Sequence, residues 1–153
     1  MTKKLIVSAC LCGKRCRYDG RSSENSTVKN FMTAWSDEGG EITPVCPEEL
    51  GELGTPRPPA ELRGGVGADI WRENSKVTVR RKVDDIDITS HFTSGAKIAA
   101  SIAANATHAL LKSRSPSCGV GSVWSDGAIV NGDGVFAALI RKNGVIVFSD
   151  EEI

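Results

Sequence analysis

The hydrophobic and polar positions along the chain follow two periods in turn, which predicts strands alternating with helices. Short apolar runs bounded by polar loops are typical of buried strands and occur at 4–9, 41–45, 107–112 and 145–148. Apolar residues at spacings of three and four predict amphipathic helices at about 26–38, 90–104 and 134–142. Strands that alternate with helices indicate a parallel sheet covered on both faces. We therefore expect a single α/β domain over residues 1–153 with a Rossmann-like, three-layer architecture.

Two segments between these elements are less regular. Residues 51–67 are rich in proline and glycine, which predicts a long ordered loop or lid. The apolar runs 69–71 and 76–80 flank a polar segment and predict a β-hairpin inserted into the domain. Asp133 stands just before the last helix and is expected to be its N-cap.

Composition adds a limit on the partners. The chain has 153 residues, of which 40% are apolar and 25% charged, as in an ordinary globular domain. Lysine plus arginine equals aspartate plus glutamate, with 19 of each, so no overall basic field attracts nucleic acid. We therefore expect a small-molecule substrate and disfavour nucleic acid as a partner. The sequence carries no signal for the oligomeric state.

The N-terminal segment has some features of a lipoprotein signal, because two lysines precede a short apolar run and Cys10. That apolar run, residues 5–9, is shorter than the roughly 7–15 residues of a signal peptide. No stretch approaches the ~20 apolar residues of a membrane span. We interpret the segment as the first buried strand and expect a cytoplasmic protein. An odd number of cysteines, five, then favours metal binding or catalysis over disulfides.

Three of the cysteines follow expected strands: Cys10, Cys46 and Cys118. Ligands of open α/β sheets bind at the carboxyl ends of the strands, so three thiolates there can converge on one soft metal centre. Proline and glycine beside these cysteines give stiff, tightly turning loops of the kind that hold iron–sulfur clusters. One alternative is that each cysteine is a small buried apolar side chain. Another is a four-cysteine zinc site drawn from Cys10, Cys12, Cys16 and Cys46.

Five motifs carry a resemblance to a known family. They are Val7-Ser-Ala-Cys-Leu11, Cys16-Arg-Tyr-Asp-Gly20, Val45-Cys-Pro-Glu48, Thr55-Pro-Arg-Pro-Pro-Ala-Glu61 and Leu111-Lys-Ser-Arg-Ser-Pro-Ser-Cys-Gly119. Together they resemble a bacterial family, formerly a domain of unknown function, that includes the thiouracil desulfidases. The resemblance extends from residue 5 to residue 148. Related proteins with an added carboxy-terminal domain act on thiouridine in transfer RNA, and this chain, which ends at Ile153, is expected to act without one.

The resemblance implies a cofactor and a reaction. The cofactor is a 4Fe–4S cluster with three cysteine ligands, which map onto Cys10, Cys46 and Cys118, and with one open iron. An open iron is a Lewis acid that suits the soft sulfur of a thione. The implied reaction is a hydrolytic, non-redox desulfuration of a 2-thiouracil-like pyrimidine to the oxo base with release of hydrogen sulfide. Cys12 and Cys16 are then spare thiols or neighbours of the cluster.

Such a reaction needs a base for the attacking water and a donor for the developing anion. Glu48 follows Cys46 by two residues and is the expected general base. The alternative interpretation of Glu48 is a carboxylate at the start of a helix, where the backbone amide dipoles stabilise its charge. Ser115 is the expected donor or proton shuttle.

The remaining expected site residues bind the substrate. Ser117 and Ser113 are close alternatives to Ser115, since serines in such loops often only cap the turn. Ser117 is also expected at the substrate, and a loop of three residues is expected to close over it: Arg17, Tyr18 and Asp19. A solvated loop is the competing interpretation for those three.

Two other functions stay open at this point. The first is a thiouridine desulfidase acting on nucleosides or transfer RNA, which the small size and neutral charge disfavour. The second is a non-catalytic zinc or iron–sulfur binding module. A colourless, zinc-loaded protein would favour the second over a desulfidase.

Overall fold

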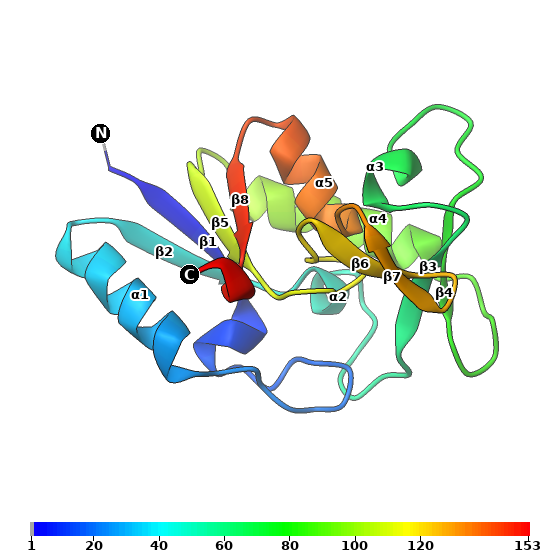
Figure 1. Ribbon diagram of the computed structural model, residues 1–153, viewed down its shortest axis with the longest axis horizontal. Helices are drawn as coiled ribbons and strands as arrows, with labels where there is room; N and C mark the ends of the chain where they lie inside the picture. The colour runs from blue at the N-terminus through cyan, green and yellow to red at the C-terminus, as the bar shows by residue number, and fades with distance from the viewer. Residues whose placement is uncertain (1) are drawn as a thin grey trace.

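The computed structural model describes residues 2–153, whose strands form two four-stranded sheets (Figure 1). The first sheet has the order β2-β1-β5-β8, and its neighbouring strands are all parallel. Its strands are β1 (Lys4–Ser8), β2 (Glu41–Val45), β5 (His108–Leu111) and β8 (Ile146–Ser149). The four strands expected from the apolar runs are therefore confirmed, as is the mainly parallel sheet.

The residues of β1 alternate between two hydrophobic clusters, one on each face of this parallel sheet. Leu5 and Val7 pack in the cluster that contains Val28 of α1 (Ser26–Asp37). Ile6 packs in the cluster that contains residues of α4 (Thr89–Ile102) and α5 (Val135–Lys142). Figure 1 accordingly shows α1 on one side of the sheet and α4 and α5 on the other. All three predicted helices are present.

The helix boundaries follow local chemistry, with one exception. Asn25 caps α1, since its side chain accepts a hydrogen bond of 3.0 Å from the backbone N–H of Val28. The expectation that Asp133 caps α5 is wrong, because the N-cap is Gly134 and it makes no side-chain cap bond. The Asp133 carboxylate instead accepts from the backbone N–H of Gly121 at 2.9 Å and from Arg141 Nε at 2.7 Å. It therefore joins the loop before β6 to α5.

The second sheet has the order β4-β3-β6-β7. Its strands are β3 (Ala60–Arg63), β4 (Thr78–Arg81), β6 (Ser122–Ser125) and β7 (Ala128–Asn131). β3 pairs antiparallel with β4 and parallel with β6, and β6 and β7 form an antiparallel hairpin. The segment 51–67, expected as a long loop, thus contains a strand.

The hairpin expected at 69–80 is wrong in its first half. Residues 67–70 form a short helix, α3 (Gly67–Ile70), and β4 takes β3 as its partner. A short apolar run has the same pattern in a strand and in a helix, so periodicity alone did not separate them. Among residues 2–153, no helix has both the length and the apolar character needed to cross a bilayer.

Candidate functional site

The three strand-end cysteines, Cys10, Cys46 and Cys118, line one cavity of about 320 Å³. Cys10 lies in a short 3₁₀ helix, η1 (Ala9–Cys12), that follows β1. Cys46 comes directly after β2 and is the N-cap residue of α2 (Pro47–Leu50), while Cys118 lies in the loop after β5. Since β2, β1 and β5 are neighbours in the parallel sheet, their carboxyl ends meet at this cavity.

All five cysteines are free thiols, and four of them, Cys12, Cys16, Cys46 and Cys118, have surroundings that raise the pKa and favour the neutral form. Burial raises the pKa of Cys118 to about 12. A hydrogen bond with Cys10 raises the pKa of Cys16 to about 11, and a hydrogen bond with Cys16 together with burial raises the pKa of Cys46. Thiolates in this cavity therefore need a cation beside them, and a metal centre supplies one.

A chain of hydrogen bonds joins Glu48 to two serines at the same cavity. Ser117 Oγ donates to Glu48 Oε2 at 2.9 Å and lies 3.0 Å from Ser115 Oγ. A hydroxyl has one proton, so Ser115 is the donor to Ser117 when Ser117 donates to Glu48. Ser115 Oγ also accepts from the backbone N–H groups of Ser117 and Cys118 at 3.2 and 3.1 Å. The order of donors therefore runs from Ser115 through Ser117 to the carboxylate.

Arg57 is a site residue that the sequence reasoning missed. Its side chain is only 6% exposed and lines the cavity. Nε donates to Glu48 Oε1 at 3.1 Å, and Nη2 donates to the backbone carbonyl of Cys16 at 2.8 Å. Nη1 donates to the Gly54 carbonyl and to Thr55 Oγ1, both at 2.9 Å. The available signal was an arginine between prolines, where the backbone is stiff.

The expected substrate loop is only partly at the cavity. Arg17 and Tyr18 line the cavity, and Tyr18 is 42% exposed at its opening. Asp19 is not among the lining residues, although its carboxylate lies 3.8 Å from Arg17 Nη2. Ser113 lines the cavity together with Ser115 and Ser117.

The two cysteines left without a role have separate environments. Cys16 is buried and lines the cavity. Cys12 is directed to α1 instead, where its thiol lies 3.7 Å from Met32 Sδ. Cys16 is therefore available to the chemistry of the cavity, and Cys12 is not among the lining residues.

The lining of the cavity is basic although the chain as a whole is neutral. In the described part of the chain, the lining contains one carboxylate, Glu48, and five cationic side chains: Arg17, Arg57, Lys82, Lys112 and Arg114. Lys82 Nζ lies 4.8 Å from the centre of the Trp124 ring, which is itself 36% exposed at the cavity. A small electron-rich or anionic ligand is attracted by such a local field.

The sequence model of the 2-thiouracil desulfurase family matches residues 5–152, nearly the full chain. The chain belongs to the 2-thiouracil desulfurase family. This family membership agrees with the resemblance of the five motifs, all of which lie within the matched residues.

Two proteins are similar to this desulfurase-family chain over almost their whole lengths. A solved structure of the [4Fe-4S]-dependent thiouracil desulfidase TudS is 36% identical, with a TM-score of 0.80, and the match covers 99% of this chain and 93% of that one. The uncharacterized protein YbbK of Bacillus subtilis (strain 168) is 34% identical over 154 residues, or 97% of each chain. The similarity to TudS confirms the mixed α/β fold.

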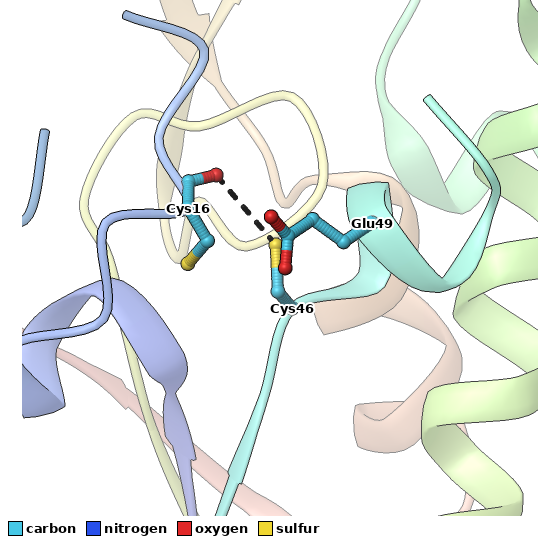
Figure 2. A group of neighbouring side chains, drawn as sticks. All are labelled: Cys16, Cys46 and Glu49. Atoms are coloured by element: carbon cyan, nitrogen blue, oxygen red, sulfur yellow. Dashed lines mark hydrogen bonds between the residues drawn. The ribbon is translucent and has the colours of Figure 1, made fainter. Parts of the chain in front are cut away.

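The residues at the cavity of this desulfurase-family member fit an iron–sulfur cluster. Four cysteines line the cavity: Cys10, Cys16, Cys46 and Cys118. Thiolates are the ligands that iron–sulfur clusters take in proteins. Figure 2 shows that Cys16 and Cys46 also have a carboxylate close by, that of Glu49, and the three ligand atoms lie within 4.8 Å of one another. The donor set therefore offers more sulfur than a three-cysteine cluster uses.

Proposed function

We propose that this protein is a 4Fe–4S-dependent desulfidase that converts a 2-thiouracil-like pyrimidine into the oxo base and releases hydrogen sulfide without net electron transfer. The observation that carries the proposal is that the three strand-end cysteines share one cavity with the hydrogen-bonded chain from Ser115 to Glu48. Family membership and the similarity to TudS support it. The whole chain is proposed to act as one desulfidase domain, and a cytoplasmic location stays a prediction.

Cys10, Cys46 and Cys118 would hold the cluster. With three protein ligands the cluster supplies one open iron, a Lewis acid for the soft sulfur of a thione. The segments that carry these cysteines follow the carboxyl ends of β1, β2 and β5, which are neighbours in the parallel sheet. Each ligand is therefore supplied by a separate segment of the chain.

Side chains of the protein would accept and donate the protons that the reaction transfers. Hydrolysis of a C=S bond moves both protons of one water molecule onto the departing sulfur, so one base and one donor suffice. Glu48 takes a proton from the attacking water. Once Glu48 is protonated, the donor order of the two serines reverses: Ser115 donates its hydroxyl proton to the developing anion, and the proton on Glu48 replaces it through Ser117, across separations of 3.0 and 2.9 Å. Within residues 2–153, no other carboxylate lines the cavity.

The outer part of the cavity would bind the ring of the substrate. Tyr18 and Trp124 are both partly exposed there, and flat aromatic surfaces stack on a pyrimidine. Arg17 and Lys82 stand beside these rings, at 5.8 Å from the Tyr18 centre and 4.8 Å from the Trp124 centre. Asp19 would contribute through its ion pair with Arg17.

The basic lining favours one alternative substrate, a thiouridine whose sugar carries phosphate. Lys82 and Lys112 line the cavity, and neither is within 4.0 Å of a carboxylate in the described part of the chain. Phosphate groups bind to such lysines. Sulfide release from 2-thiouracil, thiouridine and thiouridine monophosphate, measured side by side, separates the two substrates.

The proposal predicts that cluster and activity are lost together when a ligand is removed. After anaerobic reconstitution with iron and sulfide, the wild-type protein should be brown and release sulfide from 2-thiouracil. Cys118→Ala should lose both the visible absorbance and the sulfide release, because it removes a ligand from the cavity. The matched control is Cys12→Ala, whose thiol packs against Met32 and should keep both. A colourless wild-type protein, or full activity in Cys118→Ala, would overturn the proposal.

A further inference from the structure

Cys16, Cys46 and Glu49 form a group of ligands of which the proposed cluster uses only one. Their two sulfur atoms and one carboxylate oxygen all lie within 4.8 Å of one another. Figure 2 shows the three side chains meeting from separate segments: the loop after η1, the end of β2 and the short helix α2. Cys46 belongs to the proposed cluster, whereas Cys16 and Glu49 have no part in it.

The backbone around this group is held firmly. Cys46 and Glu49 are three residues apart, at the N-cap and in the first turn of α2, so both point to the same side. The carbonyl of Cys16 accepts from Arg57 Nη2 at 2.8 Å and lies 3.8 Å from Cys46 Sγ. Cys16 is 1% exposed, while the side chain of Glu49 is 26% exposed and gives access from solvent.

Glu49 has the outer partners that are typical of a metal-binding carboxylate. Lys14 Nζ lies 2.8 Å from its Oε1, and Thr55 Oγ1 donates to its Oε2 at 2.5 Å. Such bonds orient a ligating carboxylate and leave lone pairs on its oxygens. Two thiolates and one carboxylate carry three negative charges, which a divalent ion and Lys14 together neutralise.

We propose that the cluster-free protein binds one thiophilic divalent cation, of the Zn²⁺ class, through Cys16, Cys46 and Glu49. Zinc bonds of about 2.3 Å to sulfur and about 2.0–2.2 Å to oxygen place tetrahedral ligands roughly 3.4–3.8 Å apart. Ligand atoms that lie within 4.8 Å reach that spacing by small side-chain rotations. Three protein ligands leave the fourth position to water.

The proposed ion and the proposed cluster exclude one another, because both require Cys46. Zinc binding would therefore keep the protein free of its cluster, and cluster loading would expel zinc. This consequence rests on the proposed function, whereas the binding of the ion does not. Binding of a divalent cation at this site would thus inhibit activity by preventing cluster assembly.

Cobalt provides a direct readout of the binding without any assay of the loaded enzyme. The full-length, cluster-free protein is titrated anaerobically with Co²⁺, which reports thiolate coordination through near-ultraviolet charge-transfer bands and through visible bands of tetrahedral cobalt. We expect one equivalent to bind and to be displaced by Zn²⁺. Cys16→Ser and Glu49→Gln should each weaken binding by at least about tenfold. Their matched controls, Cys12→Ser and Glu52→Gln, should bind as the wild type does.

Cys118→Ser separates this site from the cluster site. It leaves the three proposed ligands in place, so it should bind Co²⁺ normally although it fails to hold the cluster. Equal loss of Co²⁺ in Cys118→Ser and Cys16→Ser would show that the ion also requires Cys118 and would overturn the proposal, as would no binding by the wild type. If Cys16→Ser does not fold, Glu49→Gln decides the same point. A Cys118→Ser protein that keeps its cluster would instead overturn the proposed function and leave the proposed cation site unaffected.

Competition tests the proposed control. Zn²⁺ added before iron and sulfide should slow cluster formation in the wild-type protein, followed by its visible absorbance. Cys16→Ser retains Cys10, Cys46 and Cys118, so it should form the cluster and be much less sensitive to Zn²⁺. Equal inhibition of both proteins would overturn the exclusion of cluster by zinc.

Discussion

Both oxygens of Glu48 are engaged from opposite sides, which fixes the plane of the carboxylate at the cavity. Arg57 Nε donates to Oε1 and Ser117 Oγ donates to Oε2, at 3.1 and 2.9 Å. A carboxylate oxygen has more than one lone pair, so these bonds leave room for a proton from water. Because its carboxylate is held at the cavity and can still accept a proton, Glu48 is the base of the proposed reaction.

Glu48→Gln tests that role with little change in shape. Glutamine can accept from Arg57 and occupy the same volume, but its amide does not take up a proton at neutral pH. Sulfide release from 2-thiouracil should fall about 10²–10⁴-fold, the range that general base catalysis contributes. The visible absorbance of the cluster should stay as in the wild type. Glu52→Gln is the control, since Glu52 is exposed and not among the cavity residues. Activity near that of the wild type would remove Glu48 from the mechanism.

If Glu48 is the base, Arg57 would act by orienting the Glu48 carboxylate, to which its Nε donates, so its test needs a readout beyond stability. Arg57→Lys keeps the positive charge, but an ammonium does not replace a planar group that reaches Glu48, Cys16 and Thr55 together. We expect kcat to fall about tenfold or more, as a misplaced catalytic group implies. The free energy of unfolding should fall by about 1–3 kcal/mol, because buried acceptors lose their donors.

A matched variant and chemical rescue separate positioning by Arg57 from a general loss of structure. Arg63→Lys is the control, since Arg63 pairs with Glu61 and Asp85 outside the cavity. Added guanidinium at non-denaturing concentration should restore part of the kcat of Arg57→Ala. It should not change the kcat of the control. Loss of stability without a change in kcat would show that Arg57 is only structural.

At the scale of elements, α2 is placed by its contact with α4. Gly95 of α4 lies against the backbone of α2, and a Cβ there would collide with the carbonyl oxygen of Pro47 and lie 2.8 Å from the backbone nitrogen of Gly51. Backbone atoms do not move aside as flexible side chains do. The close approach of the two helices therefore positions both Cys46 and Glu48, which stand at the start of α2.

Gly95→Ala should consequently disturb the site from a distance. Alanine favours a helix over glycine by about 1 kcal/mol. The collision with α2 outweighs this gain, since overpacking a core costs about 1–3 kcal/mol and here meets backbone. We expect a net loss of stability in urea unfolding together with weaker cluster binding. Ser94→Ala, one residue earlier on the exposed side of α4, should leave both unchanged. A stabilised Gly95→Ala protein would contradict the packing argument.

The elements also show which parts of the fold the sequence could predict. Strands with continuous apolar runs and the alanine-rich α4 have strong local patterns, and the cysteines at the ends of β1, β2 and β5 meet because neighbouring parallel strands end together. The pairing of β3 with β4 depends on partners 15 to 21 residues apart in the sequence. A three-residue apolar run did not separate α3 from a strand.

Some site residues could likewise be predicted from the sequence, and others could not. Cys10, Cys46 and Cys118 have a positional signal in the sequence, since each follows a strand. Arg57 has only its position between two prolines, because its place at the cavity depends on the carbonyl of Cys16, 41 residues away. A contact of that range is decided by the folded loops and not by any local pattern.

At the scale of the whole molecule, the cavity lies between the two sheets. The parallel sheet contributes Ser8 and Val45 from its strand ends, and the second sheet contributes Ala60 and Trp124. A group bound at the three cysteines would tie together loops that are otherwise joined by hydrogen bonds, such as those of Arg57. Cofactor and fold are thus expected to stabilise each other.

Removal of the cluster should therefore loosen the molecule locally and lower its melting temperature. A ligand that binds only the folded state stabilises it by linkage, and the gain is lost when the ligand is removed. Hydrogen exchange, measured anaerobically before and after iron chelation, should rise in residues 9–18, 46–57 and 113–118, which contain most of the residues that line the cavity. Exchange in α3 (Gly67–Ile70) should not change, because no residue of this helix lines the cavity. A uniform rise would mean global unfolding, and no rise in 46–57 would mean that Cys46 does not tether the cluster.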